Sequence, residues 1–178
     1  MKKIKDNLIE ELENGNKEYS KKNKNIFKKF LKGQSPKIAI LTCSDSRVIP
    51  EYIFNKSIGE LFVIRVAGNI ALDSTVIKSI EYGVDHLKVS HLIILGHTNC
   101  GAVKASEETN DEKDVLFNEI KESFILDPDN HFRANILRQL NMLPKRSITI
   151  NNKIKNKKLT LIGALYNLKD GQVDFFID

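Results

Sequence analysis

Two cysteines and one histidine stand where they could bind a metal ion together. Cys43 directly follows an apolar segment, residues 37–42, and His97 and Cys100 follow another, residues 91–95. If these segments are neighbouring strands of a parallel sheet, their carboxyl ends meet at one edge and the three side chains converge there. Two thiolates and an imidazole suit zinc, and three protein ligands leave a fourth position open, as in catalytic zinc sites. The residues therefore predict an open zinc site.

The same residues allow less specific interpretations. Buried cysteines often serve as small apolar side chains, two cysteines can form a disulfide, and a single histidine is often only structural. The joint placement at one sheet edge favours the metal site over these alternatives. The remaining histidines have no comparable setting, and we interpret them as structural or surface residues: His86, His91 and His131.

A carboxylate and a guanidinium follow the first cysteine at intervals of two residues. Asp45 is the nearby group that could fill or control the open metal position, and Arg47 could hold Asp45 ionised and oriented as a paired charge. Cys100 would begin a helix, where the helix dipole favours a thiolate.

Length and composition exclude several classes of protein. The chain has 178 residues, two cysteines and a formal net charge of +5. This length fits a single domain, 1–178, and two cysteines are too few for a disulfide framework or a four-cysteine zinc site. The apolar runs are too short to cross a membrane, and the start of the chain lacks the apolar core of a signal peptide, so we expect a cytoplasmic protein. The excess charge is mostly lysine without clustered arginine and aromatic residues, which argues against a nucleic-acid partner.

Strand and helix patterns alternate along the chain and position these residues. Continuous apolar segments predict buried strands at 37–42, 61–66 and 91–95, with a helix at 73–86 before the third. This order indicates an α/β fold with a mostly parallel central sheet flanked by helices. The remaining predictions are an N-terminal helical arm over 1–33, interrupted at 14–16, helices at 102–108, 111–124 and 130–142, and a strand, turn and strand at 159–168, 169–171 and 172–177.

Five motifs carry a resemblance that covers essentially the whole chain. They are Cys43-Ser-Asp45-Ser-Arg47, Arg65-Val-Ala-Gly68-Asn69, Ser79-Ile-Glu-Tyr-Gly-Val84, Gly96-His97-Thr-Asn-Cys100-Gly101 and Gly163-Ala-Leu-Tyr-Asn-Leu-Lys-Asp-Gly-Gln-Val173. With these motifs in this order, the sequence resembles the β-class carbonic anhydrases.

The resemblance implies an activity and a set of site residues. Cys43, His97 and Cys100 would bind one Zn²⁺ per subunit, and Asp45 with Arg47 would form the catalytic pair. The implied reaction is the reversible hydration of carbon dioxide to bicarbonate and a proton, by attack of zinc-bound hydroxide. Asp45 would be a fourth zinc ligand in an inactive state.

The resemblance also implies substrate contacts and an assembly. Gln34 and the backbone amide of Gly101 would contact the substrate, Gln34 from across a subunit interface. The protein would be a homodimer or a higher even oligomer, with the arm over 1–33 in contact with the partner. One bacterial subgroup has a second, inhibitory bicarbonate site that uses a tryptophan and an arginine. Arg65 matches that arginine, but Ile40 stands in place of the tryptophan, so we do not expect that site here.

Three other functions remain open from the sequence. A hydrolase of carbon disulfide or carbonyl sulfide could use the same ligands. A non-catalytic, regulatory zinc-binding relative would result if Asp45 closed the metal permanently. A lysine-driven nucleic-acid binder is the least favoured of the three.

Overall fold

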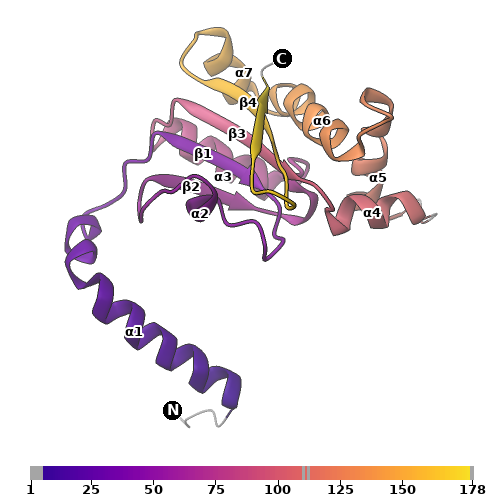
Figure 1. Cartoon of the computed structure of the whole chain (residues 1–178). Coiled ribbons are helices and arrows are strands. Elements are labelled where there is room, and N and C mark those ends of the chain that lie inside the picture. Colours follow the sequence, from indigo (N-terminus) through magenta and orange to yellow (C-terminus); the bar gives the residue numbers. More distant parts are fainter. Residues whose placement is uncertain (1–5, 110, 112, 177–178) are drawn as a thin grey trace. The chain divides into compact units, whose positions relative to one another are not determined.

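The structure, a computed structural model, describes residues 6–109, 111 and 113–176, and the chain divides into two units, residues 1–34 and 35–178. Its elements are shown in Figure 1. The ends of the predicted domain, residues 1–5 and 177–178, lie outside the described residues, as does residue 177 of the last predicted strand.

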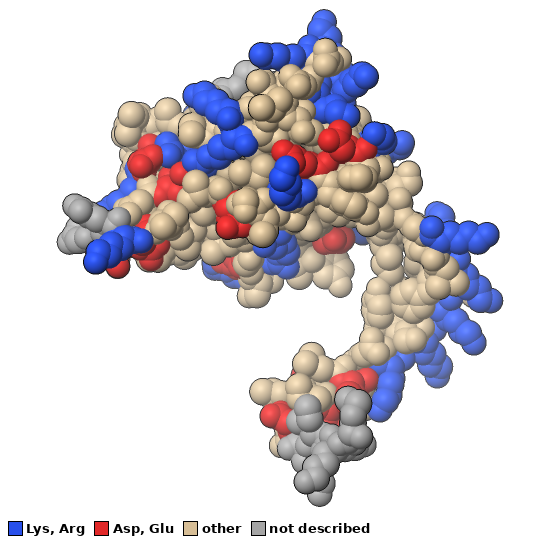
Figure 2. Space-filling view, turned by 180° about the vertical axis from the view of Figure 1, so that it is seen from behind, with Lys and Arg blue, Asp and Glu red and all other residues tan. Residues whose placement is uncertain are grey.

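Among its described residues, 6–34, the first unit contains one helix, α1 (Asn7–Phe30). We predicted an interruption at 14–16, but the helix is continuous through Gly15. The Asp6 side chain caps the helix by accepting hydrogen bonds from the amides of Leu8 and Ile9. A glycine inside a helix costs only about 1 kcal/mol relative to alanine, which is too little to end a helix of this length. Lysine side chains gather on one side of α1 in Figure 2.

The second unit is built on a five-stranded sheet in the order β2-β1-β3-β4-β5. The first four strands of this order are parallel, and β5 pairs antiparallel with β4. This sheet, with its flanking helices and the strand–turn–strand at the end, confirms the predicted fold class. The strands are β1 (Ile38–Thr42), β2 (Leu61–Arg65), β3 (His91–His97), β4 (Thr160–Tyr166) and β5 (Val173–Phe176).

The two faces of the sheet are covered differently. Alternate residues of β1 and β3, such as Leu41 and Ile94, pack in one apolar cluster with the helices α3 (Ser74–Asp85), α6 (His131–Arg146) and α7 (Ile148–Lys155). Residues of the opposite parity, such as Ile40 and Ile93, face the other side. Among the described residues of that second cluster, the short helix α2 (Pro50–Ile53) is the only helix that contributes a member, Ile53.

Several helix bounds differ from those predicted, because capping residues decide them. The helix predicted at 111–124 is α5 (Val115–Lys121), which begins after Asp114 because that side chain accepts from the amide of Phe117, and it is followed by the 3-10 turn η2 (Phe124–Leu126). The helix predicted at 130–142 continues through Pro144 as α6. Helices α2 and α7 and the 3-10 turn η1 (Ala67–Asn69) were not predicted. Each is short, and apolar periodicity is a weak signal over one or two turns.

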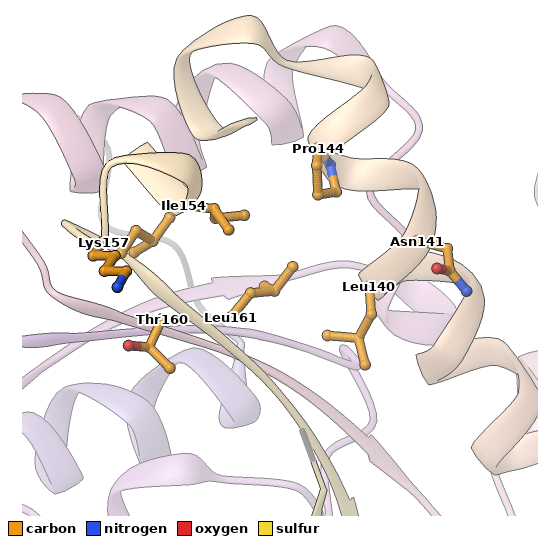
Figure 3. A pocket seen from close by; sticks show the side chains of 8 residues that line it. Leu140, Asn141, Pro144, Ile154, Lys157, Thr160 and Leu161 are labelled. Carbon is orange, nitrogen blue, oxygen red and sulfur yellow. The ribbon is translucent and has the colours of Figure 1, made fainter. Parts of the chain in front are cut away.

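A cavity of about 380 Å³ lies between α6, the end of α7 and the start of β4. Figure 3 shows Leu140, Ile154 and Leu161 lining it. Thr160, at the amino end of β4, lines it, whereas the predicted ligand His97 pairs with the carboxyl end of that strand at Tyr166. The cavity therefore takes no part in the site described below. Among the described residues, no helix is both long enough and apolar enough to cross a membrane.

Candidate metal centre

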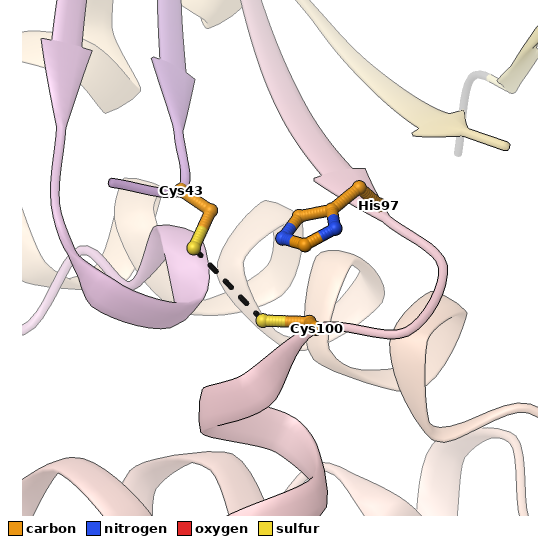
Figure 4. Close-up of side chains that lie close together, drawn as sticks. All are labelled: Cys43, His97 and Cys100. Carbon is orange, nitrogen blue, oxygen red and sulfur yellow. Dashed lines mark hydrogen bonds between the residues drawn. The ribbon is translucent and has the colours of Figure 1, made fainter. Parts of the chain in front are cut away.

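The three predicted ligands meet at the carboxyl edge of the sheet. Cys43 follows β1, His97 ends β3, and Cys100 is the N-cap residue of α4 (Gly101–Glu108). Strands β1 and β3 are paired with Thr42 opposite Leu95, so their ends carry Cys43 and His97 to the same place. Their sulfur and ring nitrogen atoms all lie within 4.8 Å of one another, and Figure 4 shows the side chains pointing toward a common centre.

The two sulfurs are spaced for a shared metal ion and not for a disulfide. The Sγ atoms of Cys43 and Cys100 lie 3.9 Å apart, and both cysteines are free. A disulfide would require about 2.05 Å. Two zinc–sulfur bonds of about 2.3 Å at the tetrahedral angle place the sulfurs about 3.8 Å apart. The observed spacing therefore fits a tetrahedral zinc ion.

The imidazole of His97 presents one free nitrogen to this centre. Its Nδ1 lies 2.9 Å from the carbonyl oxygen of Thr98, which can only accept, so Nδ1 carries the proton and Nε2 holds a lone pair. The side chain is 1% exposed, and Nε2 has no hydrogen-bond partner among the described residues. A buried polar atom without a partner is rare and costly. A metal ion would provide the missing partner, and a histidine whose other nitrogen binds a carbonyl is the usual form of such a ligand.

The thiol pair has shifted pKa values in the metal-free protein. The hydrogen bond from Cys100 lowers the pKa of Cys43 far below its ordinary value, against the opposing effect of burial. The same pairing, together with burial, raises the pKa of Cys100. The pairing thus favours a thiolate on Cys43 and a thiol on Cys100. Since metal ligands must be deprotonated, a dication in this position would displace the thiol proton.

Asp45 lies beside the ligands but is bound to Arg47. The Nε and Nη2 atoms of Arg47 donate to the two carboxylate oxygens at 2.9 and 2.7 Å, and the Arg47 backbone amide donates to Oδ1 at 3.0 Å. These hydrogen bonds hold the pKa of Asp45 well below its usual range, against a smaller effect of burial. Its Oδ2 is 3.8 Å from Nε2 of His97. Asp45 is therefore an ionised acceptor at the edge of the metal centre.

The other predicted contacts are placed as follows. Gly101 is the exposed first residue of α4. Apart from its chain neighbours and the backbone of α4, no described heavy atom lies within 4 Å of where its Cβ would be. The role of its amide as a substrate contact stays a prediction. Gln34 is exposed and belongs to the first unit. Its role as a substrate contact stays a prediction.

The remaining histidines contact side chains outside the candidate metal centre. His86 stacks on Tyr82 with ring centroids 5.0 Å apart, His91 contacts the hydroxyl of Ser90, and His131 pairs with Glu107. Within the described residues, the Cys43–His97–Cys100 group is the only cluster of three or more His, Cys, Asp or Glu side chains that could hold a metal.

Two residues of the segment between His97 and Cys100 were not predicted to have a role. Thr98 fixes the His97 ring through its carbonyl, and its hydroxyl accepts a hydrogen bond from the Leu168 amide in the β4–β5 turn. Asn99 adopts a left-handed conformation with φ of 56°, and its carbonyl accepts from Arg47 at 3.4 Å. The asparagine before Cys100 could have indicated this left-handed turn, because asparagine tolerates a positive φ better than most residues.

Comparison with known proteins identifies the family. The family model described as carbonic anhydrase matches residues 38–173, which is most of the chain. The chain belongs to the β-class carbonic anhydrases. It is 30% identical to a carbonic anhydrase of Synechococcus elongatus over 93% of this chain and 69% of that protein. It is 35% identical to carbonic anhydrase 2 of Mycobacterium tuberculosis over 79% of this chain and 74% of that protein.

A solved structure supports the same family. The β-carbonic anhydrase of Coccomyxa superimposes with a TM-score of 0.80 at 27% identity, covering 96% of this chain and 85% of that chain. The chain is therefore an enzyme of the β-carbonic anhydrase family, with a candidate metal site made by two cysteines and a histidine.

Proposed function

We propose that this protein is a zinc-dependent carbonic anhydrase that catalyses the reversible hydration of carbon dioxide to bicarbonate and a proton. The observation that carries this proposal is the buried Cys43–His97–Cys100 cluster, with its tetrahedral sulfur spacing and its unpartnered Nε2 atom. Three protein donors leave a fourth position for solvent, as catalytic zinc requires.

Each residue of the site would have a separate role in the reaction. When bound, zinc supplies Lewis-acid chemistry that lowers the pKa of a coordinated water, as it does in the carbonic anhydrases that use three histidines. Asp45 would accept a hydrogen bond from the attacking water and so orient its lone pair toward the carbon. Arg47 supports this role because its three hydrogen bonds keep Asp45 ionised and turned to the guanidinium. The backbone amide of Gly101 would donate to the bound product, with Gln34 as a second contact from across the subunit interface.

We infer further that the protein forms a homodimer, or a higher even oligomer, in the cytoplasm. The sheet face that carries Ile40 and Ile93 includes an apolar groove of about 250 Å³, which Phe175 also lines. The apolar side of α1 is likewise exposed, with Leu8 at 70% and Leu12 at 69%. An exposed apolar side of a helix and an apolar groove in a sheet face are what an arm-and-face interface between two copies would need.

Stopped-flow measurement of carbon dioxide hydration between pH 6 and 9 tests the activity, alongside the metal content of the protein. We expect about one zinc per subunit, and loss of activity when a chelator removes it. Asp45→Asn is expected to lower kcat/KM by about 10²-fold or more, because the positioned acceptor is lost. The exposed Asp129→Asn is the matched control and should have no effect.

Two results would contradict the proposed reaction. Zinc binding without hydration at any pH would point to a regulatory relative in which Asp45 closes the metal. Hydrolysis of carbonyl sulfide or carbon disulfide, with no hydration of carbon dioxide, would point to a sulfur-substrate hydrolase. Full hydration by Asp45→Asn would remove Asp45 from the mechanism.

A further inference from the structure

Arg65 contacts the backbone of the metal-binding segment at two points. It is the last residue of β2 and lies opposite Thr42 in the β1–β2 pairing. Its Nε donates to the carbonyl of Cys43 at 3.3 Å, and its Nη2 donates to the carbonyl of Asp45 at 2.7 Å. One guanidinium therefore reaches the carbonyls of both the candidate ligand and the candidate catalytic carboxylate.

The position of these contacts matters because regular strand pairing stops just before them. The last pairing of β1 involves Thr42, whose carbonyl accepts from the Val66 amide at 3.0 Å. Beyond it, the chain makes a turn in which the Val48 amide donates to the carbonyl of Asp45 at 3.0 Å. That bond stabilises the turn internally but does not attach it to the sheet. Arg65 attaches the turn to β2, since it is anchored in that strand and bonds on both sides of Ser44.

The same contacts occupy the Nε/Nη2 edge of Arg65, one of the two edges with which a guanidinium can hold an anion. A guanidinium grips a carboxylate or bicarbonate with two parallel N–H donors. Here Nε and Nη2 are both engaged by backbone carbonyls. Ile40, which stands where a second bicarbonate site would have a tryptophan, is fully buried in the sheet.

We propose that Arg65 is a positioning residue, which fixes the Cys43 sulfur and the Asp45 carboxylate relative to the sheet through its two bonds to their backbone carbonyls. This inference rests on the metal-binding part of the proposed function and not on the identity of the substrate. Partners of metal ligands commonly change metal affinity by about 10- to 100-fold when they are removed.

The test compares Arg65→Lys and Arg65→Ala with the intact chain. Lysine keeps the charge but is a single point donor, so it cannot hold two carbonyls in the way that the guanidinium fork does. We expect both variants to bind zinc about 10- to 100-fold more weakly in competition with a chelator. Their cobalt-substituted forms should also show an altered thiolate-to-cobalt absorption, which reports on the geometry at the metal.

Two matched controls separate positioning from charge and from general stability. Arg133→Lys changes another partly exposed arginine, which pairs with Asp127, and should leave both readouts unchanged. Leu143→Ala removes a fully buried side chain and destabilises the fold, but should leave the cobalt spectrum unchanged. Thermal unfolding of the metal-free proteins gives the loss of stability in each variant.

The outcomes are distinguishable. If Arg65→Lys binds zinc as tightly as the intact chain, the fork is not needed and the inference is wrong. It is also wrong if Leu143→Ala weakens zinc binding and alters the cobalt spectrum as much as Arg65→Ala does. If the intact chain binds neither zinc nor cobalt, it is the proposed function that fails.

Discussion

At the scale of single residues, the site depends on which partner each polar group has. Asp45 has two possible partners, the Arg47 guanidinium and a metal ion bound at Nε2 of His97. The Oδ2 atom of Asp45 lies 3.8 Å from Nε2 of His97. The structure shows it bound to Arg47 by both side-chain and backbone hydrogen bonds. A carboxylate with three charge-assisted or oriented donors has a low pKa, so it stays ionised as an acceptor over the whole physiological range.

Removing Arg47 should reverse this shift. We expect Arg47→Ala to raise the pKa of Asp45 toward its ordinary value of about 3.9, because the bonds that favour the ionised form are lost. The native pKa lies below the unfolded one. The stability contributed by this pair is therefore present above about pH 4 and lost as the pH falls through the native pKa. NMR titration of the Asp45 carboxyl measures the change.

Asp73 is the internal control for that titration. Its pKa is also lowered, through hydrogen bonds from Thr75, and should not respond to Arg47→Ala. If the Asp45 carboxyl already titrates near pH 4 in the intact metal-free protein, the pairing with Arg47 does not lower its pKa.

At the scale of elements, the position of His97 depends on the contact between β3 and α6. Gly96 precedes His97 in β3, and a Cβ at Gly96 would lie 2.7 Å from both Cγ1 and Cδ1 of Ile136. Ile136 is fully buried on α6. The absence of a side chain at position 96 thus allows the helix to pack closely against the strand that supplies a metal ligand.

Substitutions at this contact should not be additive. Gly96→Ala is expected to destabilise the fold by about 1–3 kcal/mol through overpacking. Ile136→Ala should destabilise it by about 2–5 kcal/mol through a cavity. The double variant should lose less free energy of unfolding than the sum of the two single losses, because the new methyl group occupies part of the space that Ile136 leaves. Urea unfolding of the four proteins measures this, and a sum that agrees within about 0.5 kcal/mol would show that the two positions are independent.

At the scale of the whole molecule, the two units each leave apolar surface exposed. In the second unit, α3, α6 and α7 cover one face of the sheet, whereas the other face carries the groove that Phe175 lines. In the first unit, Leu8 and Leu12 of α1 are exposed, and Figure 2 shows the lysines of the helix gathered on one side. Burying such surfaces is the main driving force for stable association.

Placing charge on α1 should therefore change the state of association. We expect Leu8→Glu with Leu12→Glu to convert the proposed dimer into a monomer, because both leucines are about 70% exposed in the single chain and would become buried at the interface. Sedimentation velocity measures the mass in solution. Lys21→Glu with Lys28→Glu changes the charge of the same helix on its polar side and should leave the dimer intact. Unchanged association of the leucine variant would mean that α1 is not the contact.

Much of the fold was predictable because its signals are local. The apolar runs predicted at 37–42 and 61–66 are short and continuous, and they correspond to β1 and β2. The helix predicted at 73–86 corresponds to α3, which Asp73 caps through the amide of Thr75. Helix α7 was missed because a two-turn helix offers too few repeats to reveal a period. The continuity of α1 through Gly15 was missed because an unfavourable residue within a long helix is outweighed by its neighbours.

The sequence by itself determined the candidate ligands, since residue types and their positions after two strands place Cys43, His97 and Cys100 at one edge of a parallel sheet. Only the tertiary structure decided how they are held. The Thr98 carbonyl selects the nitrogen of His97 that is free, and Arg65 links the turn after Cys43 to the next strand. The physical reason is distance along the chain. Strand and helix patterns depend on neighbouring residues, whereas the direction of these hydrogen bonds depends on how distant segments pack.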